Sequence, residues 1–335
     1  MPATIEMALG RVQAVGGGQG ISFKAQILRE ADMTRKLLLT VMVFLQCVLL
    51  GCTVLTVTPS RGGEPVAFQA PQASQMAQAV KVVLVILENT NADEAHDPKY
   101  PFLWRLAQEG AYLSNYHAVA HPSQPNYVAL VSGSTEGVQG DSPARLHRPH
   151  LGQKLASWMV YAEGYPGGAC DIRMEIGRYA RKHVPFLSFA DVQDDPELCR
   201  SHITGFDAFG ETALAHRLPG FSLVVPDLDH DAHDKPLRVA DAWLEQNFGK
   251  LLDDAGFRRD VILIVVFDES GEKWPYTNHD DNRVYAALWG DHVIPGEVKT
   301  VHDHYDLLRT LEALFGLPPM STGDGKAQAI GGILR

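Results

Sequence analysis

The sequence predicts an α/β domain built around a mostly parallel sheet, because short apolar segments alternate with segments of helical periodicity. The apolar segments are residues 80–87, 221–225 and 261–267, with a shorter candidate at 284–289. A short run that is apolar throughout is typical of a strand buried on both faces of a parallel sheet. The helical patterns are residues 100–109, 240–255 and 305–315. This alternation favours helices packed against the sheet.

The bulk composition fits one large domain and argues against one class of function. Of the 335 residues, 45% are hydrophobic, which is ordinary for a globular protein. The formal net charge is -11, whereas a general nucleic-acid-binding protein would show a basic stripe. We therefore expect no nucleic-acid binding. The 14 histidines include several in aspartate-rich surroundings, which indicates metal sites.

The first 52 residues are expected to be an export segment. Arg35 and Lys36 precede an apolar run at residues 37–50, which is the layout of a signal peptide starting near Met33. The run is shorter than the about 20 residues that a membrane-spanning helix requires. It ends in Leu-Leu-Gly-Cys52, which resembles a bacterial lipobox and implies a lipidated cysteine. An uncleaved anchor helix is the alternative.

This interpretation predicts the place of the protein in the cell. Lipidation of Cys52 would anchor it to the periplasmic or cell-surface face of a bacterial membrane. Residues 53–79 are rich in Thr, Pro, Gly, Gln and Ala, and are expected to form a flexible tether. Residues 80–335 would then form the catalytic domain. Residues 1–32 precede Met33 and are left out of the fold prediction.

Two cysteines, Cys170 and Cys199, lie beyond the export segment. Export would place them in an oxidising compartment, where disulfides form and persist. We therefore expect a disulfide between them. Two independent buried thiols are the alternative.

Acidic and polar residues follow three of the predicted strands. Glu88-Asn89 follows the first, residues 226–234 (PDLDHDAHD) follow the second, and Asp268-Glu269 follows the third. In an open α/β sheet, ligands bind beyond the carboxyl ends of the strands. A single acidic residue there would be explained as a helix cap, but three such groups together predict a binding site at this edge.

A proline-flanked serine lies in residues 121–127, HPSQPNY. Two prolines restrict the backbone around Ser123 and hold its hydroxyl in a fixed orientation, as a nucleophile requires. Taken alone, the heptad slightly favours an ordinary proline-rich turn in which the serine is a local cap. Together with carboxylates and histidines it suits phosphate ester hydrolysis, in which a metal ion offsets the charge of the phosphoryl group and activates the attacking hydroxyl. A phosphoseryl intermediate would divide hydrolysis into two displacements.

Six motifs, in order, resemble those of the phosphoesterase family, which includes bacterial phospholipases C and acid phosphatases of the alkaline phosphatase-like superfamily. They are Glu88-Asn89, the heptad 121–127, residues 179–186 (YARKHVPF), residues 226–234, Phe267-Asp268-Glu269 and residues 304–312 (HYDLLRTLE). The resemblance covers roughly residues 80–318. It implies an alkaline phosphatase-like fold, a three-layer α/β/α sandwich, and a metal-dependent phosphoric ester hydrolase.

The resemblance also implies roles for individual residues. Ser123 would be the nucleophile, and Asn126 would hydrogen-bond a phosphoryl oxygen. His121 belongs to the same heptad and is counted with the catalytic candidates. His183 would contact phosphate or act as a general acid, held over the site by the Cys170–Cys199 segment; a loop-capping histidine is the alternative.

The metal ligands implied by the resemblance come from the strand ends and from one C-terminal histidine. They are Glu88, Asn89, Asp231, His233, Asp268, Glu269 and His304, with Asp227 or Asp229 as further candidates. The ion would be Zn, Mn, Mg or Ca. The partner would be a small phosphorylated substrate, either a monoester or a diester.

Three other functions are alternatives. A phospholipase C of this type would be expected to carry added C-terminal domains, which favours a small phosphatase or phosphodiesterase. A catalytically silent surface lipoprotein would be expected to have lost its nucleophile or its strand-end carboxylates. A sulfatase-like enzyme is disfavoured because Asn126 follows Pro125 where that group of enzymes has arginine.

Overall fold

The computed structural model describes residues 80–167, 170–271 and 281–335. The predicted export segment, the lipidated Cys52 and the tether at residues 53–79 lie outside these ranges. Within them, we find no helix with the length and apolar character that crossing a bilayer requires.

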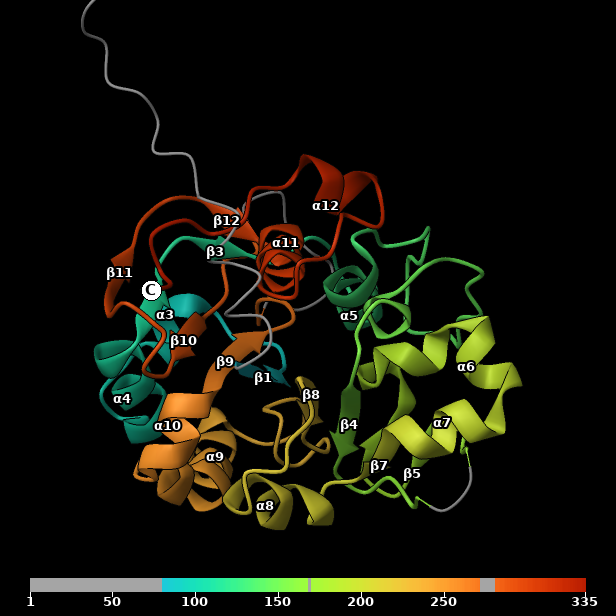
Figure 1. Cartoon of the computed structure of the whole chain (residues 1–335), viewed down its shortest axis with the longest axis horizontal. Helices are drawn as coiled ribbons and strands as arrows, with labels where there is room; N and C mark the ends of the chain where they lie inside the picture. Colours follow the sequence, from blue (N-terminus) through green and yellow to red (C-terminus); the bar gives the residue numbers. More distant parts are fainter. Residues whose placement is uncertain (1–79, 168–169, 272–280) are drawn as a thin grey trace, which may run out of the picture. The chain divides into compact units, whose positions relative to one another are not determined.

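An eight-stranded sheet forms the centre of the described domain, in the order β11-β2-β10-β9-β1-β8-β4-β7 (Figure 1). The parallel part consists of β1 (Lys81–Leu87), β8 (Phe221–Val225), β9 (Val261–Phe267), β4 (Trp158–Ala162) and β7 (Ile203–Gly205). All residues of β8 and β9 are buried, and so are six of the seven in β1. The prediction of a mostly parallel sheet is therefore confirmed.

Three shorter strands extend the sheet beyond β9. β10 (Ala286–Trp289) runs antiparallel to both β9 and β2 (Ala111–Leu113), and β11 (Gly296–Val298) pairs parallel with β2. Two small ribbons lie apart from the sheet. One pairs β3 (Tyr116–His117) with β12 (His302–Asp303), and the other pairs β5 (Glu175–Ile176) with β6 (Tyr179–Ala180).

Helices cover both faces of the sheet (Figure 1). One group comprises α4 (Pro101–Glu109), α8 (Asp207–Leu214), α9 (Leu237–Leu252) and α10 (Ala255–Asp260). The other comprises α5 (Ser123–Ser132), α11 (His304–Leu314) and α12 (Thr322–Lys326). Near the β4–β7 end lie α6 (Ala190–Asp194) and α7 (Pro196–His202), while α3 (Ala92–Ala95) follows β1. Three 3-10 helices complete the domain: η1 (Leu151–Gln153), η2 (Arg181–His183) and η3 (Pro185–Ser188).

The predicted helix at residues 240–255 is divided in the structure. α9 begins earlier, at Leu237, and ends at Leu252. Asp254 then starts α10 by accepting a hydrogen bond from the backbone N–H of Phe257. A carboxylate in this position satisfies a backbone donor at the start of a helix and favours a new helix over continuation of the old one. The predicted strands at residues 80–87 and 284–289 begin one and two residues later than expected.

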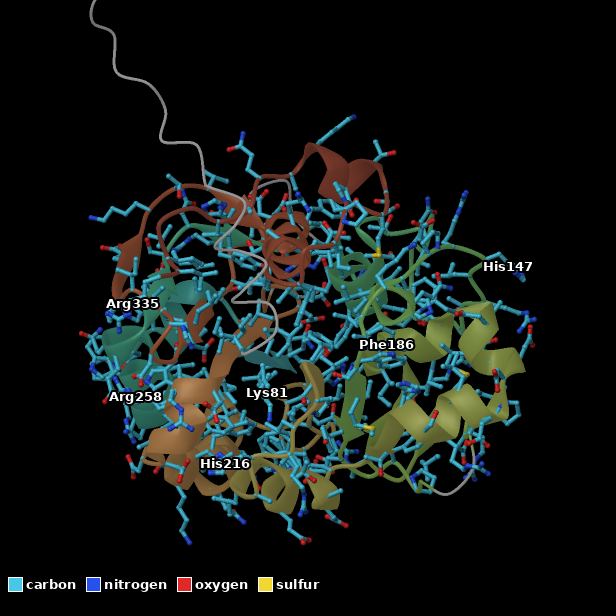
Figure 2. The ribbon with its side chains drawn as sticks, in the orientation of Figure 1. Lys81, His147, Phe186, His216, Arg258 and Arg335 are labelled. Carbon is cyan, nitrogen blue, oxygen red and sulfur yellow. A yellow bond between two sulfur atoms is a disulfide. The ribbon has the colours of Figure 1, made fainter. Side chains whose placement is uncertain are left out.

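Side-chain contacts at the periphery fix the ends of several elements. Lys81, at the start of β1, donates to the backbone carbonyl of His216, 2.7 Å away. At the C-terminus, Arg335 donates to the backbone carbonyl of Asp291, whose carboxylate also pairs with Arg258 on α10. Figure 2 shows Arg258 and Arg335 on the same flank of the domain. The last residue is therefore tied to the helix that precedes β9.

A buried acid pair joins α11 to the region of α12, and it predicts a pH-dependent stability. Glu312 is fully buried, and burial together with the neighbouring Asp324 raises its pKa to about 8. Asp324 is also fully buried, and it accepts hydrogen bonds from the backbone N–H groups of Ser321 and Gly325. The folded protein therefore holds a proton on Glu312 that the unfolded chain releases near the ordinary value of 4.5.

We expect this stabilisation to be complete below about pH 4.5 and to be lost as the pH rises to about 8, with a change of at most about 5 kcal/mol. Glu312→Gln, which imitates the neutral acid, should flatten this slope. Urea denaturation at both ends of the interval measures it. An unaltered slope in the variant would assign the pH dependence to other groups.

Candidate active site

Four buried carboxylates meet at the carboxyl edge of the central strands. Glu88 follows β1, Asp231 lies in the loop after β8, and Asp268 and Glu269 follow β9, each no more than 4% exposed. β8 and β9 flank β1 in parallel, so their ends lie side by side. The backbone N–H of Glu88 donates to the carbonyl of Asp231 at 2.8 Å, and that of Asp268 to Leu87 at 2.9 Å. We call these four residues the carboxylate cluster.

The hydroxyl of Ser123 points into the carboxylate cluster. Ser123 is the first residue of α5, after the N-cap Pro122, and is 2% exposed. Its Oγ lies 3.0 Å from Glu88 Oε2 and 3.2 Å from Glu269 Oε1. A hydroxyl has one proton, so it donates to one carboxylate at a time. Both acceptors are placed to remove that proton.

Asn89 connects two members of the carboxylate cluster. Its φ of 52° lies in the left-handed region, which asparagine tolerates better than most residues. In this conformation its backbone N–H donates to Asp268 Oδ1 at 3.1 Å, and its amide Nδ2 donates to Glu88 Oε2 at 3.2 Å. Asn89 therefore fixes the positions of the carboxylates that follow β1 and β9.

His183 supplies a buried positive charge to the carboxylate cluster. It belongs to η2, is 1% exposed, and stacks on Tyr127 with ring centroids 5.0 Å apart. Its Nε2 lies 3.0 Å from Glu88 Oε1, and its Nδ1 lies 3.3 Å from Asp231 Oδ2. Burial opposes the charge on His183, but these two carboxylates outweigh it and raise its pKa to about 9. Burial likewise opposes ionisation of Glu88, but His183 and other nearby cations lower its pKa to about 2.

The other three carboxylates lack enough nearby positive charge to stabilise their ionised forms. Burial, together with the charge of Glu88, raises the pKa of Asp268 well above its ordinary value and raises those of Glu269 and Asp231. Asp268 Oδ2 is buried and accepts no hydrogen bond within the described ranges. Buried charges are stable when they are paired or coordinate a metal. The cluster therefore fits a divalent cation, for which carboxylate oxygens are suitable ligands.

His121 extends the site toward its surface. Its Nδ1 contacts Glu269 Oε2, while the other oxygen of Glu269 accepts from Ser123. The side chain of His121 is 13% exposed and that of Glu269 is 5% exposed. A chain of contacts thus runs from the surface through Glu269 to the buried hydroxyl.

The comparison with known families decides the identity of this arrangement. Residues 94–318 match the model of the phosphoesterase family. The chain belongs to the phosphoesterase family. It is accordingly a hydrolase that acts on phosphate esters, as predicted from its sequence motifs.

Relatives and solved structures agree with this assignment. The chain is 32% identical to a phosphatidylinositol-3-phosphatase of Mycobacterium tuberculosis, over 73% of this chain and 80% of the relative. It is 33% identical to a phosphate-repressible acid phosphatase of Penicillium chrysogenum, over 73% of this chain but 61% of that longer relative. A solved structure in the alkaline phosphatase superfamily from Vibrio parahaemolyticus shares the fold, with a TM-score of 0.54 at 15% identity over 75% of this chain and 69% of that chain.

Two residues expected at the phosphoesterase site are occupied by other hydrogen bonds. Asn126 accepts from the backbone N–H groups of Val119 and Ala120 and donates to the carbonyls of Ala120 and Pro122. Its amide therefore shapes the loop before Ser123 in this structure, and its expected contact with a phosphoryl oxygen stays a prediction.

His304 likewise uses both ring nitrogens. Nε2 donates to the backbone carbonyl of Asp268 at 2.7 Å, and Nδ1 accepts from the hydroxyl of Tyr116 at 2.9 Å. Full burial lowers its pKa to about 4, so the ring is neutral. His304 thus supports the backbone of Asp268 and has no ring nitrogen left over for a metal.

The aspartate-rich loop after β8 divides between two places. Asp231 joins the carboxylate cluster, and it also accepts from the backbone N–H of His233 at 2.7 Å. The ring of His233 lies 6.1 Å from that of His183, and its Nδ1 contacts Asp234. Asp227 and His230 instead meet Glu163, and within the described ranges this is the one group of histidine and carboxylate ligands whose ligand atoms all lie within 4.8 Å of one another, as holding a metal ion requires. Spacing in the sequence left these alternatives open.

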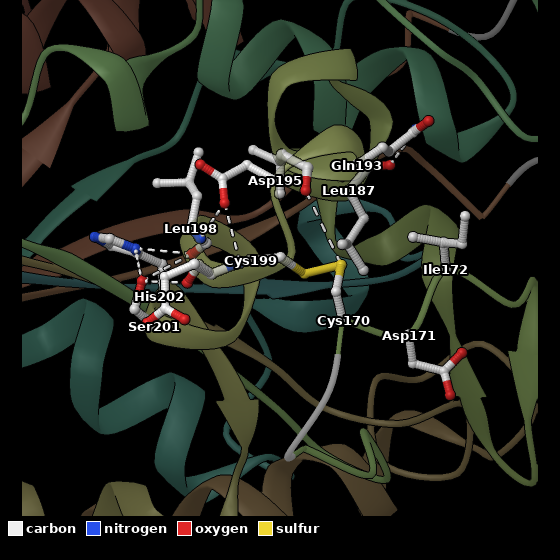
Figure 3. Close-up of a disulfide and its surroundings, with 12 residues drawn as sticks. Cys170, Asp171, Ile172, Leu187, Gln193, Asp195, Leu198, Cys199, Ser201 and His202 are labelled. Carbon is white, nitrogen blue, oxygen red and sulfur yellow. Dashed lines mark hydrogen bonds between the residues drawn. A yellow bond between two sulfur atoms is a disulfide. The ribbon is translucent and has the colours of Figure 1, made fainter.

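The predicted disulfide between Cys170 and Cys199 is confirmed. It joins the segment leading to the β5–β6 hairpin to helix α7, as Figure 3 shows. Arg181 provides a second connection, because its guanidinium donates to the backbone carbonyls of Ile172, Ala144 and Leu187. These contacts hold the hairpin against η2, which carries His183.

Removal of the disulfide should therefore lower stability. The bridge spans a sequence separation of 29 residues, for which loop-closure entropy predicts a loss of about 3–4 kcal/mol in a Cys170→Ser, Cys199→Ser variant. Urea denaturation of the two proteins measures this difference, with reduced wild-type protein as the matched control. If reduction and the double substitution both left the midpoint in place, the bridge would have no stabilising role.

Proposed function

We propose that this phosphoesterase is a metal-dependent phosphoric ester hydrolase of the acid phosphatase type that acts through a covalent phosphoseryl intermediate. The observation that carries the proposal is the position of Ser123 Oγ between Glu88 and Glu269, at 3.0 and 3.2 Å. The names of several relatives support the monoester substrate. A phosphodiesterase, including one of the phospholipase C type, is the alternative outcome of the test.

The first displacement would use the residues that surround Ser123. One carboxylate, Glu88 or Glu269, accepts the hydroxyl proton as Oγ bonds to phosphorus and the bond to the alcohol breaks. His183, whose pKa is raised to about 9, carries a proton for the departing alkoxide. Water then attacks phosphoserine and gives a proton to His183, and the bond from phosphorus to Ser123 Oγ breaks as the protonated carboxylate returns its proton to Oγ and phosphate leaves.

A divalent cation would be held by Glu88, Asn89, Asp268 and Glu269. When bound it supplies positive charge that offsets the charge of the phosphoryl group and lowers the pKa of the serine hydroxyl. Asp231 balances His183 in this scheme. His121 would hold Glu269 in position through its contact with Oε2.

Four basic residues, Arg173, Arg178, Arg181 and Lys182, follow Cys170 in the segment that the disulfide closes and could bind the phosphate, but their contacts differ. Arg173 pairs with Asp171, Arg178 pairs with Asp234, and Arg181 donates to backbone carbonyls. Lys182 instead pairs with Asp141 at 2.8 Å and is close enough for its charge to act on Glu88. We therefore assign the additional phosphate-binding charge to Lys182.

The test is release of phosphate or alcohol from p-nitrophenyl phosphate and from bis(p-nitrophenyl) phosphate. Purified protein freed of metal would be assayed with added Zn, Mn, Mg or Ca. Activity on the monoester that depends on an added metal supports the proposal. Preference for the diester would establish the alternative, and full activity without metal would contradict the metal dependence.

We also propose that the protein is exported and anchored through Cys52. The support is the signal-peptide layout of residues 33–52 and the disulfide, which is typical of an oxidising compartment. A Cys52→Ser variant should leave the membrane fraction. Unchanged membrane partition and processing of that variant would argue for an uncleaved anchor helix instead.

A further inference from the structure

A small cavity lies beside the reaction centre, which we define as Ser123, His183 and the carboxylate cluster. Its volume is about 230 Å³. Its wall includes Gln124 and Lys182, the immediate neighbours of Ser123 and His183 in the chain, as well as His233. The ring of His233 lies 6.1 Å from that of His183, and the charge of Lys182 acts on Glu88, so the cavity lies next to the reaction centre.

The wall of this cavity is held in place by polar contacts. Asp141 accepts from the backbone N–H of Gln124 at 3.0 Å through Oδ1 and pairs with Lys182 Nζ at 2.8 Å through Oδ2. Met174 and Glu175 belong to the hairpin segment that the disulfide secures. The cavity thus presents hydrogen-bond donors and acceptors beside an apolar wall.

Gln124 is the unexplained member of this wall. It is 2% exposed, and its amide Nε2 is buried with no hydrogen-bond partner within the described ranges. Buried polar groups are nearly always paired, so an unpaired amide in a cavity wall calls for an explanation. The terminal torsion of glutamine is soft, so a small rotation can turn either end of the amide toward a ligand.

We propose that this cavity is a leaving-group subsite for a small hydroxylated alcohol, and that the Gln124 amide hydrogen-bonds one of its oxygens. The inference rests on the proposed function, because it names the class of phosphate ester that Ser123 would cleave. Hydroxyl groups both donate and accept, which matches Asp141 and Glu175 as acceptors and Gln124 as the donor. The volume lies below the roughly 300–1,000 Å³ of pockets for drug-sized ligands, which favours a compact polyol.

The test compares two monoesters with the same carbon skeleton, glycerol 1-phosphate and propyl phosphate. The full-length protein, loaded with its activating metal, should show a kcat/KM about tenfold or more higher for glycerol 1-phosphate, because a site that hydrogen-bonds a hydroxyl rejects the analogue that lacks it. Gln124→Met should reduce this ratio about tenfold, and Gln124→Glu should also reduce it. Gln153→Met, at an exposed glutamine that borders a different cavity, should keep the wild-type ratio.

Specific outcomes would overturn the inference. If the wild-type kcat/KM for glycerol 1-phosphate were close to that for propyl phosphate, the cavity would not recognise hydroxyl groups. Equal losses on both esters in Gln124→Met and Gln124→Glu, with thermal unfolding at the wild-type temperature, would place Gln124 at the phosphoryl group. Hydrolysis of both esters at equal kcat/KM would refute the subsite but leave the proposed function standing. A folded protein that is inactive on both esters and on p-nitrophenyl phosphate would refute the proposed function as well.

Discussion

Replacement of Ser123 by alanine is expected to lower kcat for p-nitrophenyl phosphate by about 10⁴- to 10⁶-fold, the range seen when an enzyme loses its nucleophile. The variant keeps the carboxylate cluster and removes only the oxygen that lies 3.0 Å from Glu88 and 3.2 Å from Glu269. Metal binding should persist, because Asn89, Asp268 and both glutamates remain. Initial rates with saturating metal measure the effect.

Ser132→Ala is the matched control for this experiment. Ser132 ends the same helix, α5, and is similarly buried, but the acceptors available to its hydroxyl are the backbone carbonyls of Val128 and Ser134. We expect it to retain activity within a few-fold. A Ser123→Ala protein that hydrolysed the substrate at a rate near that of this control would show that water attacks phosphorus directly.

Asp268→Asn is expected to change metal binding and stability in opposite directions. Asp268 is fully buried among like charges, and one of its oxygens accepts no hydrogen bond within the described ranges. The substitution removes a ligand, so metal affinity and activity should fall by more than the 10- to 100-fold typical of residues that only support ligands. In metal-free protein it removes electrostatic repulsion, so stability should rise by about 1–2 kcal/mol.

Calorimetric metal titration, with urea denaturation in the presence and absence of a chelator, separates the two effects. Asp241→Asn is the control, since Asp241 is also buried and also accepts backbone hydrogen bonds, from Phe102 and Leu103, but is not part of the carboxylate cluster. Its effect on stability should be the same with and without metal. Loss of stability in metal-free Asp268→Asn would show that the carboxylate cluster needs no cation to offset its charge.

The sequence predicted the centre of the fold better than its margins. Strands β1 and β9 have seven residues each and β8 has five, all wholly or almost wholly apolar, and such runs can be recognised as buried strands from the sequence alone. The strands β2, β7 and β11 have three residues each, too few to establish a periodicity. The division of α9 from α10 depends on one capping carboxylate, Asp254, inside an otherwise helical pattern.

The site was predictable to the extent that topology determines it. Residues that directly follow parallel strands must share an edge, so Glu88, Asp268 and Glu269 could be grouped from the sequence. Orientation within loops could not be predicted in this way. Asn126 and His304 lie near that edge, but the spacing of residues in the sequence does not predict their hydrogen bonds to backbone groups of other segments.

The contacts of two further side chains near the site, Tyr127 and Asn282, could not be predicted for the same reason. Tyr127 belongs to the recognised heptad, but its stacking on His183 joins residues 56 positions apart. Asn282 lies outside the six motifs, and it links the backbone N–H of Ser270 to the carbonyl of Ala120. Such contacts depend on where loops meet, which a local pattern does not specify.

The central claim is that Ser123 carries the phosphoryl group between two displacements. The most direct test is rapid acid quenching of the metal-loaded protein during turnover of p-nitrophenyl phosphate, followed by mass spectrometry of the peptide that contains residues 121–127. The account predicts one added phosphoryl group on Ser123, formed within a turnover and absent from Ser123→Ala. A peptide that stays unmodified while p-nitrophenol is released in a burst, or a phosphoryl group found on a histidine instead, would contradict it.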